Sequence, residues 1–270
     1  MIIIGEKINS TLKSVRPAVE AYDKAVIQKL AKDQEAAGAT FIDVNAGVFV
    51  DDEPERLKWL VETVQQVVSI PLAIDSPNPR AMRLGLQAHK NGRPVLNSIT
   101  AETKRWNDVL PLALEFKTEI IALTMDDKGM PDSAKARVEI ADRMIKNLTK
   151  EGVPLDWIHI DPLVKPVGTN TQDGGAALEA IRAIKFMYPQ VHISGGLSNV
   201  SFGLPARKLM NTTFLVAAMA AGMDGAILDP LDKKLMSFVY AAEALLDHDD
   251  FCMEYITQYR EGTFDSFLGK

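Results

Sequence analysis

The chain has 270 residues, of which 47% are hydrophobic and 24% charged, so it can bury a large core and carries no compositional mark of disorder. Its 36 acidic and 30 basic residues give a formal net charge of −6 without a basic tract, which argues against a nucleic-acid partner. The apolar runs are strand-sized, well below the ~20 residues of a membrane-spanning helix, so no membrane segment is expected. The first residues lack the pattern of a secretory signal, and we expect a cytoplasmic protein.

Eight short apolar runs rich in β-branched residues recur along the chain and predict eight strands. They are Met1–Ile4, Thr40–Val44, Leu72–Ile74, Pro94–Leu96, Ile120–Leu123, Trp157–Ile160, Val191–Ser194 and Met223–Leu228. Amphipathic stretches with helical spacing lie between them, such as the one that carries Val26, Leu30 and Ala37 on one face. Each predicted strand is therefore followed by a predicted helix.

Helix boundary signals support this alternation. Pro54 lies just inside one predicted helix start, Ser133 can cap another, and Gly222 falls where a helix should stop. A closing helix is expected from Asp232 to Leu246, and the aromatic tail that follows it is expected to be a packed extension. Eight β/α units predict a single-domain (β/α)8 TIM barrel over residues 1–270. The rival doubly wound sheet would need a G-x-G-x-x-G motif, which the first turn lacks.

Polar side chains stand at the carboxyl end of nearly every predicted strand. They are Glu6, Asn9, Asp43, Asn45, Asp75, Asn97, Ser98, Asp161, Ser198, Asn199 and Asp229. In a barrel of this kind the active site is built at these ends. Asp and Asn together match a heterocycle edge that carries N–H donors beside a carbonyl acceptor, as in an aminopyrimidinone. The alternative for any one of them is a helix cap or turn former, and the Gly195-Gly196 pair leaves a phosphate site open.

Few residues suggest a metal or a nucleophile. The single cysteine, Cys252, excludes an internal disulfide and a multi-cysteine zinc site, and it is expected to be a small packed residue. The four histidines are not paired at the spacing that zinc favours, so no protein-bound metal is expected. His159 and His192 fall on predicted strands, where we expect hydrogen-bonded structural roles.

Six motifs together carry a resemblance to a known family. They are Gly5-Glu6-Lys7-Ile8-Asn9, Asp43-Val44-Asn45-Ala46-Gly47, Asp75-Ser76, Leu96-Asn97-Ser98, Ile160-Asp161-Pro162 and Gly196-Leu197-Ser198-Asn199-Val200-Ser201. In this order they resemble the pterin-binding family, and more narrowly the methyltetrahydrofolate:corrinoid protein methyltransferases, which include the folate module of cobalamin-dependent methionine synthase. The similarity runs through nearly the whole chain.

The resemblance implies roles for particular residues. Asp75, Asn97 and Asp161 would bind the aminopyrimidinone edge of the pterin. Asn199 would be the catalytic residue, since it matches the position that reaches N5, the nitrogen that carries the methyl group. The matches of Gly196, Ser198 and Arg207 imply substrate-binding positions near the pterin or its tail. Lys7 departs from the arginine that relatives often have, and we leave it out of the site because lysine lacks the planar fork of arginine.

The resemblance also implies the substrates and partners. A methyl group would move between N5 of (methyl)tetrahydrofolate and the cobalt of a corrinoid (cobalamin), in either direction. The chain lacks a D-x-H-x-x-G corrin-binding segment, and the surroundings of His89 do not fit one, so the corrinoid is expected on a separate protein. Relatives commonly form homodimers, and a homodimer is the expectation here.

Two other functions remain open on the same scaffold. The first is a non-catalytic pterin-binding or corrinoid-docking subunit, which would keep the ring anchors and lose the N5 partner. The second is dihydropteroate synthase, which would need a lysine close after the seventh strand and an arginine motif at the eighth. This chain instead has Ser198-Asn199-Val200 and Ile227-Leu228-Asp229 at these places. Both are therefore less favoured by the sequence than methyl transfer.

Overall fold

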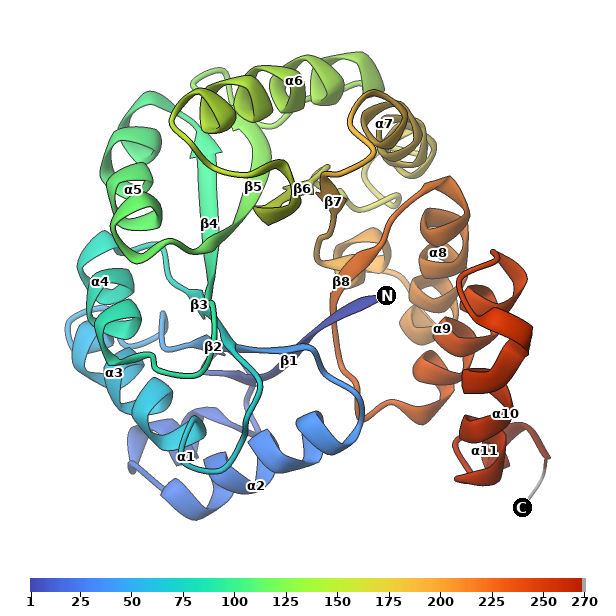
Figure 1. The fold of residues 1–270 in the computed structure, drawn as a ribbon, viewed down its shortest axis with the longest axis horizontal. Helices are drawn as coiled ribbons and strands as arrows, with labels where there is room; N and C mark the ends of the chain where they lie inside the picture. Colours follow the sequence, from blue (N-terminus) through green and yellow to red (C-terminus); the bar gives the residue numbers. More distant parts are fainter. Residues whose placement is uncertain (269–270) are drawn as a thin grey trace.

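The computed structural model describes residues 1–268 as a barrel of parallel strands ringed by helices (Figure 1). The strands are β1 (Ile2–Asn9), β2 (Phe41–Asn45), β3 (Leu72–Asp75), β4 (Val95–Ala101), β5 (Glu119–Asp126), β6 (Ile158–Asp161), β7 (His192–Ile193) and β8 (Gly225–Leu228). Their order is β7-β6-β5-β4-β3-β2-β1-β8, and every ladder is parallel. The predicted (β/α)8 fold is confirmed, with β1 and β4 longer than the sequence predicted.

Helices follow the strands and cover the outside of the barrel (Figure 1). They are α1 (Arg16–Glu20), α2 (Lys24–Ala36), α3 (Glu53–Val64), α4 (Pro79–Ala88), α5 (Thr103–Phe116), α6 (Ala134–Lys150), α7 (Asp173–Met187), α8 (Arg207–Ala221), α9 (Lys233–Leu245), α10 (Met253–Arg260) and α11 (Asp265–Leu268), with short 3₁₀ helices η1 (Leu155–Trp157), η2 (Leu197–Ser201) and η3 (Asp250–Cys252). Within residues 1–268 no helix combines the length and apolarity that crossing a bilayer requires.

The helix boundaries predicted from the sequence are confirmed. Pro54 lies in the first turn of α3, where its missing N–H leaves no bond unmade. The Ser133 hydroxyl caps α6 by accepting from the Ala136 amide at 3.2 Å. Gly222 ends α8 at a φ of 111°, a left-handed conformation that glycine adopts without strain. Asp232 caps α9, so the closing helix stands where the sequence predicted it.

The barrel closes weakly between β7 and β8. β7 has only two residues, and the two strands share one isolated bridge, between Gly196 and Ile227. Backbone hydrogen bonds support this seam from Asp224 N to the Ile193 oxygen (3.2 Å) and from Ile227 N to the Gly195 oxygen (3.1 Å). Neighbouring strands elsewhere in the barrel pair over longer ladders.

An inner layer of apolar side chains fills the barrel. It consists of Ile4, Phe41, Ala73, Val95 and Ile121, with Ile2, Leu123 and Ile227 packed against them. Side chains that alternate along a strand return to the same face every second residue. The position two residues beyond Ile4 is therefore Glu6, and the equivalent positions on the next three strands are Asp43, Asp75 and Asn97. A polar layer thus lies directly above the inner layer, at the mouth.

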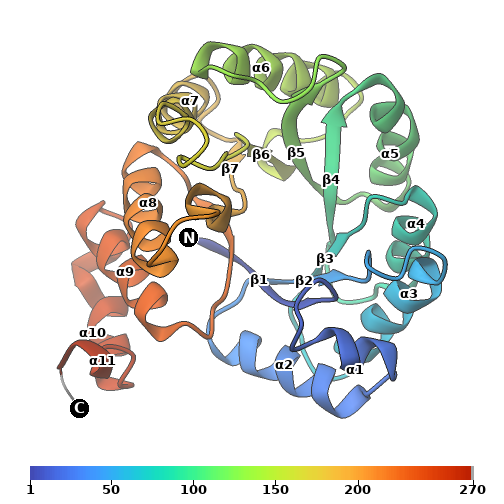
Figure 2. The ribbon, with the colours of Figure 1, turned by 180° about the vertical axis from the view of Figure 1, so that it is seen from behind.

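The C-terminal tail packs on the outside of the ring, beside α9 (Figure 2). Phe264 is buried there, with its ring centroid 4.7 Å from that of Tyr255, whereas Phe267 is about half exposed. The expected packed extension is thus confirmed for Phe264 but not for the whole aromatic set. The expectation that Cys252 is packed is wrong, because this residue ends η3, directly before α10, and is exposed.

The two strand histidines have the structural roles that the sequence predicted. His159 is fully buried, and its Nε2 lies 2.8 Å from the Glu119 carboxylate. His192 Nδ1 lies 2.9 Å from the Asp224 carboxylate. Within residues 1–268, no group of three or more His, Cys, Asp or Glu side chains is arranged to hold a metal ion.

Gly85 offers a test of the packing between α4 and the barrel. A Cβ at this position would lie 2.8 Å from the Ile74 side chain, closer than a methyl group allows. Gly85→Ala should therefore destabilise the protein by about 1–3 kcal/mol despite the better helix propensity of alanine, as urea unfolding would measure.

Gly175→Ala is the matched control, because this exposed helical glycine has open space around it. It should leave stability unchanged or raise it by about 0.5 kcal/mol. A Gly85→Ala protein as stable as the Gly175→Ala protein would contradict the packing described here.

Candidate active site

The polar layer at the mouth comes from neighbouring strands in register. Asp75 at the end of β3 is paired with Asn45 of β2 on one side and with Asn97 of β4 on the other. The ladder between β4 and β5 shifts register between Asn97 and Ile99, and such irregularities redirect side chains. The sequence predicted that the fourth strand ends at Leu96, directly before Asn97, but β4 continues to Ala101.

Hydrogen bonds orient the amide groups of this layer. Asn45 donates from Nδ2 to the Asp75 carboxylate at 2.8 Å and accepts from the Gly47 amide at 2.9 Å. Asn97 donates from Nδ2 to the Asp43 carboxylate at 2.9 Å. Asp43, Asn45 and Asn97 are buried, so these bonds lie away from water and hold the side chains in fixed orientations.

Asp161 is held at the end of β6 by backbone donors. Its carboxylate accepts from the Leu163 amide at 2.8 Å and from the Gly196 amide. A Cβ on Gly195 would lie 2.8 Å from this carboxyl group, so a glycine is needed where the chain passes it. The fully buried Arg137 of α6 donates to the Pro162 oxygen (2.8 Å) and so fixes the turn after Asp161.

Burial changes the acidity of the mouth carboxyl groups. It raises the pKa of Asp75, Asp161 and Glu6 to about 6 in each case, with the nearby Asp229 charge adding to the effect on Glu6. The pKa of Asp43 lies well above its usual value, because the group is buried and close to Asp75. Carboxyl groups that titrate near neutrality inside a cavity are typical of functional sites.

The segment after β7 carries the other predicted site residues. Asn199 lies exposed in η2, and the Ser198 carbonyl accepts a hydrogen bond from the Arg207 guanidinium at 2.6 Å. Arg207 also donates to the Ser201 hydroxyl at 3.0 Å, so it braces the turn that presents Asn199. Gly196, through its amide, contacts Asp161. The structure thus joins Gly196 directly to an anchor and places Arg207 behind the turn.

A cavity of about 200 Å³ connects this segment to the barrel ends. Ser198 lines it together with Glu6 of β1 and Asp229, which follows β8. Lys7 donates to the Asp229 carboxylate at 3.0 Å on the same side of the mouth. Lys7 therefore lies in the neighbourhood of the site, although we did not assign it there from the sequence.

Asp43 and Glu6 are two further candidate site residues. The sequence predicted both at strand ends but did not assign them to the site. Asp43 contacts the anchor Asn97, and Glu6 lines the mouth cavity. The signal that could have found them is the two-residue alternation, which aligns both with Asp75 above the inner layer.

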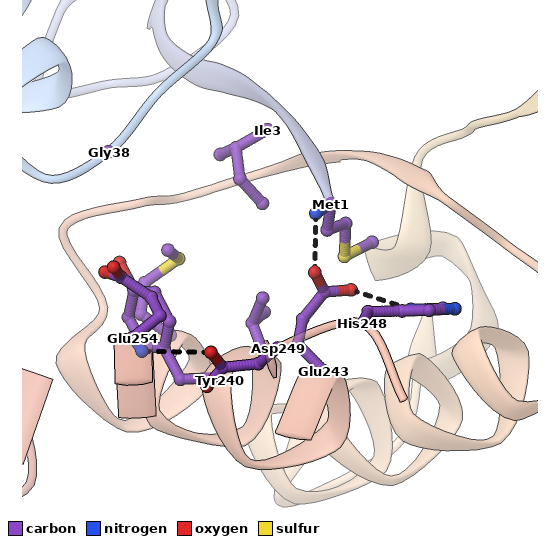
Figure 3. A pocket seen from close by; sticks show the side chains of 10 residues that line it. Met1, Ile3, Gly38, Tyr240, Glu243, His248, Asp249 and Glu254 are labelled. Carbon is purple, nitrogen blue, oxygen red and sulfur yellow. Dashed lines mark hydrogen bonds and ion pairs between the residues drawn. The ribbon is translucent and has the colours of Figure 1, made fainter. Parts of the chain in front are cut away.

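A second cavity, of about 290 Å³, lies at the opposite end of the barrel, where β1 begins (Figure 3). The α-amino group of Met1 donates to Glu243 at 2.8 Å, and His248 Nδ1 lies 3.4 Å from the same carboxylate. These polar groups partner one another. Since catalytic groups of such barrels stand at the carboxyl ends of the strands, the mouth is the candidate active site.

Comparison with known proteins defines the class. The family of pterin binding enzymes matches residues 5–229, and the chain belongs to this family. The matched region extends from the first motif of β1 to the residue after β8, so it includes the whole mouth.

Particular relatives are similar over different lengths. The methylcorrinoid:tetrahydrofolate methyltransferase of Eubacterium limosum is 39% identical over 264 residues, which cover 97% of each chain. The methionine synthase of Mycobacterium tuberculosis is 33% identical over 84% of this chain but only 20% of its own length. The resemblance noted in the sequence is confirmed by these matches.

Solved structures of dihydropteroate synthase share the fold. The enzyme from Xanthomonas albilineans in complex with 7,8-dihydropteroate has a TM-score of 0.67 at 19% identity, over 91% of this chain and 92% of that one. The Yersinia pestis enzyme with a pterine-sulfa conjugate has a TM-score of 0.69 at 18% identity, over 91% and 94%. At such identity the likeness concerns architecture alone.

The raised pKa of Asp43 predicts a pH-dependent stability difference. Since the folded-state pKa lies above the unfolded one, the folded protein disfavours the ionised form, and stability contributed by this group falls as pH rises through that range. Asp43→Asn should therefore gain stability relative to the unsubstituted protein on going from about pH 4, near the ordinary pKa of the group, to about pH 8, as urea unfolding at both values would show. A difference that does not change with pH, or that moves the other way, would contradict this assignment.

Proposed function

We propose that this protein is a methyltransferase that moves a methyl group between the cobalt of a corrinoid and N5 of tetrahydrofolate. One observation carries the proposal: the buried Asn97 and Asp161 and the half-buried Asp75 stand on barrel strands at the mouth, with Asn199 on the segment that follows β7. The similarity to the E. limosum enzyme over 97% of both chains supports it.

The anchors suit the aminopyrimidinone edge of a pterin. That edge offers N–H donors from its amino group and ring nitrogen beside a carbonyl oxygen. Carboxylates accept from such donors, and an amide can serve either partner. The ionised forms of Asp75 and Asp161 are the acceptors, so binding should weaken as pH falls below their pKa of about 6. A charge-assisted hydrogen bond in a dry site is stronger than one in water.

Asn199 is proposed to act at N5. In transfer from the corrinoid, the N5 lone pair attacks the methyl carbon while the cobalt–carbon bond breaks and leaves both electrons on cobalt. N5 becomes positively charged and then releases its proton. The Asn199 amide oxygen can accept a hydrogen bond from N5–H and stabilise that charge, but an amide cannot take up the proton. The proton is transferred to solvent or to a mouth carboxyl group such as Glu6.

The direction named for the E. limosum relative, from methylcorrinoid to tetrahydrofolate, is the one we propose here. A catalyst stabilises the same transition state in both directions, so the site itself is compatible with either. The reverse reaction requires that N5 be protonated as the methyl group leaves, which the same carboxyl groups can support.

A separate corrinoid protein would dock over the mouth. Apolar side chains are exposed on the segments that follow the strands, namely Val50, Met130, Phe202 and Leu209. Apolar side chains exposed around a polar cavity are typical of protein interaction sites. We propose that these residues contact the partner, so that the corrin face meets the bound pterin.

We also propose a cytoplasmic homodimer that folds as one domain. The cleft of about 390 Å³ between α9 and the tail supports self-association, because it is lined by Phe238, Tyr255, Phe264 and Phe267. Light scattering at micromolar concentration would give the mass. A monomer would remove the homodimer from the proposal without affecting the chemistry.

Asn199→Ala tests the catalytic assignment. Loss of a group used mainly in the transition state should lower turnover by about 10²–10³, with a smaller effect on tetrahydrofolate affinity. The assay is anaerobic conversion of methylcobalamin and tetrahydrofolate, and of cob(I)alamin and methyltetrahydrofolate, followed by the corrinoid absorption spectrum. Asn147→Ala, an exposed position on α6, is the matched control and should be unaffected.

The outcomes separate the alternative functions. Turnover in neither direction with free or protein-bound corrinoid, together with tight folate binding, would support a non-catalytic pterin-binding subunit. Condensation of a pterin pyrophosphate with 4-aminobenzoate would support dihydropteroate synthase. An Asn199→Ala protein with full turnover would remove this residue from the catalytic role.

Asp75→Asn tests the anchoring role. The amide keeps an acceptor for Asn45 but loses the charge, so the affinity for tetrahydrofolate should fall about 10- to 100-fold. Calorimetry at about pH 7.5, above the pKa of about 6, would measure the change when the carboxyl group is ionised. Unchanged affinity in the folded variant would contradict the pterin orientation proposed here.

A further inference from the structure

Arg105 joins the end of β3 to the middle of β4, the two places that carry the proposed pterin anchors Asp75 and Asn97. From α5, its Nε and Nη2 donate to the Ser98 carbonyl at 3.0 and 2.6 Å. Nη2 also donates to the Ser76 carbonyl at 2.9 Å, and Nη1 donates to the Pro77 carbonyl at 2.7 Å. One guanidinium group therefore bonds to three backbone oxygens, two from the turn after β3 and one from β4.

These oxygens belong to the residues next to the anchors. Ser76 directly follows Asp75, and Ser98 directly follows Asn97. The turn after β3 and strand β4 are also linked by a backbone hydrogen bond from Ser76 N to the Asn97 oxygen at 3.1 Å. A shift of the guanidinium group would therefore be passed to both anchors through one peptide unit each.

We propose that Arg105 is a positioning residue, which fixes the separation and orientation of Asp75 and Asn97 for binding the pterin edge. This inference rests on the proposed function. The planar fork is required because a lysine ammonium on its flexible stem cannot reproduce the directed bonds to three carbonyls of two separate segments.

The charge of Arg105 has a second, separable effect. It lowers the pKa of Asp75, against the larger effect of burial, and so favours the carboxylate that accepts from the pterin. Other ionisable groups face this region from the neighbouring elements: Asp43 from β2, Glu53 from α3, and Glu102 and Asp108 from the start and body of α5. All of these side chains are retained in variants that replace Arg105 alone.

Two substitutions separate geometry from charge. Arg105→Lys keeps the charge and loses the fork, whereas Arg105→Met loses both. Tetrahydrofolate affinity is measured by calorimetry across pH, with thermal unfolding as the measure of folding. Arg83→Lys is the matched control, because Arg83 lies half-exposed on α4 and pairs with Glu115 at 2.8 Å on the surface.

Both variants should bind tetrahydrofolate at least about tenfold more weakly at about pH 7.5. The acidic limb of the binding profile is the pH range over which the affinity for tetrahydrofolate falls on acidification. In Arg105→Lys this limb should stay in place. In Arg105→Met it should move to higher pH, because the pKa of Asp75 rises when the positive charge is removed, so a higher pH is needed to ionise it. A purely structural role would lower the unfolding temperature without moving this limb.

Folded variants that bind like the Arg83→Lys control, with an unmoved limb in Arg105→Met, would overturn the proposal. If Arg105→Met does not fold, the affinity of Arg105→Lys alone decides the geometric claim. Failure of the unsubstituted protein to bind tetrahydrofolate would instead overturn the proposed function, so the two failures are distinct.

Discussion

The burial of carboxyl groups directly above an apolar inner layer is the constraint on which the mouth depends. Ile4, Phe41 and Ala73 exclude water from below, and the ionised forms of Asp43 and Asp75 are disfavoured in such surroundings. Each buried carboxylate therefore needs a partner that donates. Amide side chains supply donors from within the layer, and backbone N–H groups supply them to Asp161. The arrangement of asparagines beside aspartates follows from this requirement.

A mouth of this kind is destabilising to the empty protein and favourable to a ligand rich in N–H groups. Active sites commonly retain such groups at the expense of stability. The surrounding shell limits the loss by fixing the backbone, and the charge of Arg105 also favours the Asp75 carboxylate. Arg137 bonds to the carbonyls after Asp161, and Arg105 bonds to those after Asp75 and Asn97. Precision at the site thus originates in the outer helices, whose side chains reach the turns from behind.

The sequence was sufficient for the order of strands and helices because each apolar run is short and several helix boundaries carry a capping side chain, a proline or a glycine. It was insufficient for the length of β4, since a register shift lets the strand continue beyond Asn97. Asp75, Asn97 and Asp161 were predictable as a set of strand-end residues. The role of Arg105 was not, because its partners are backbone oxygens and no side-chain pattern encodes them. Cys252 was misjudged for a related reason: exposure at a helix start depends on how the tail folds back.

The weak seam between β7 and β8 makes the barrel less rigid there than at the strands with longer ladders. The proposed anchors Asp75 and Asn97 belong to ladders of three to six residue pairs, whereas Asn199 follows a strand of two residues. Segments with few ladder hydrogen bonds open at lower free energy than the rest of a fold. Two of the three proposed ring anchors, Asp75 and Asn97, therefore lie on the rigid side of the molecule. Asn199, which we propose to act at N5, lies on the side that opens more easily, so in the proposed reaction a bulky carrier can approach N5 while these two anchors stay fixed.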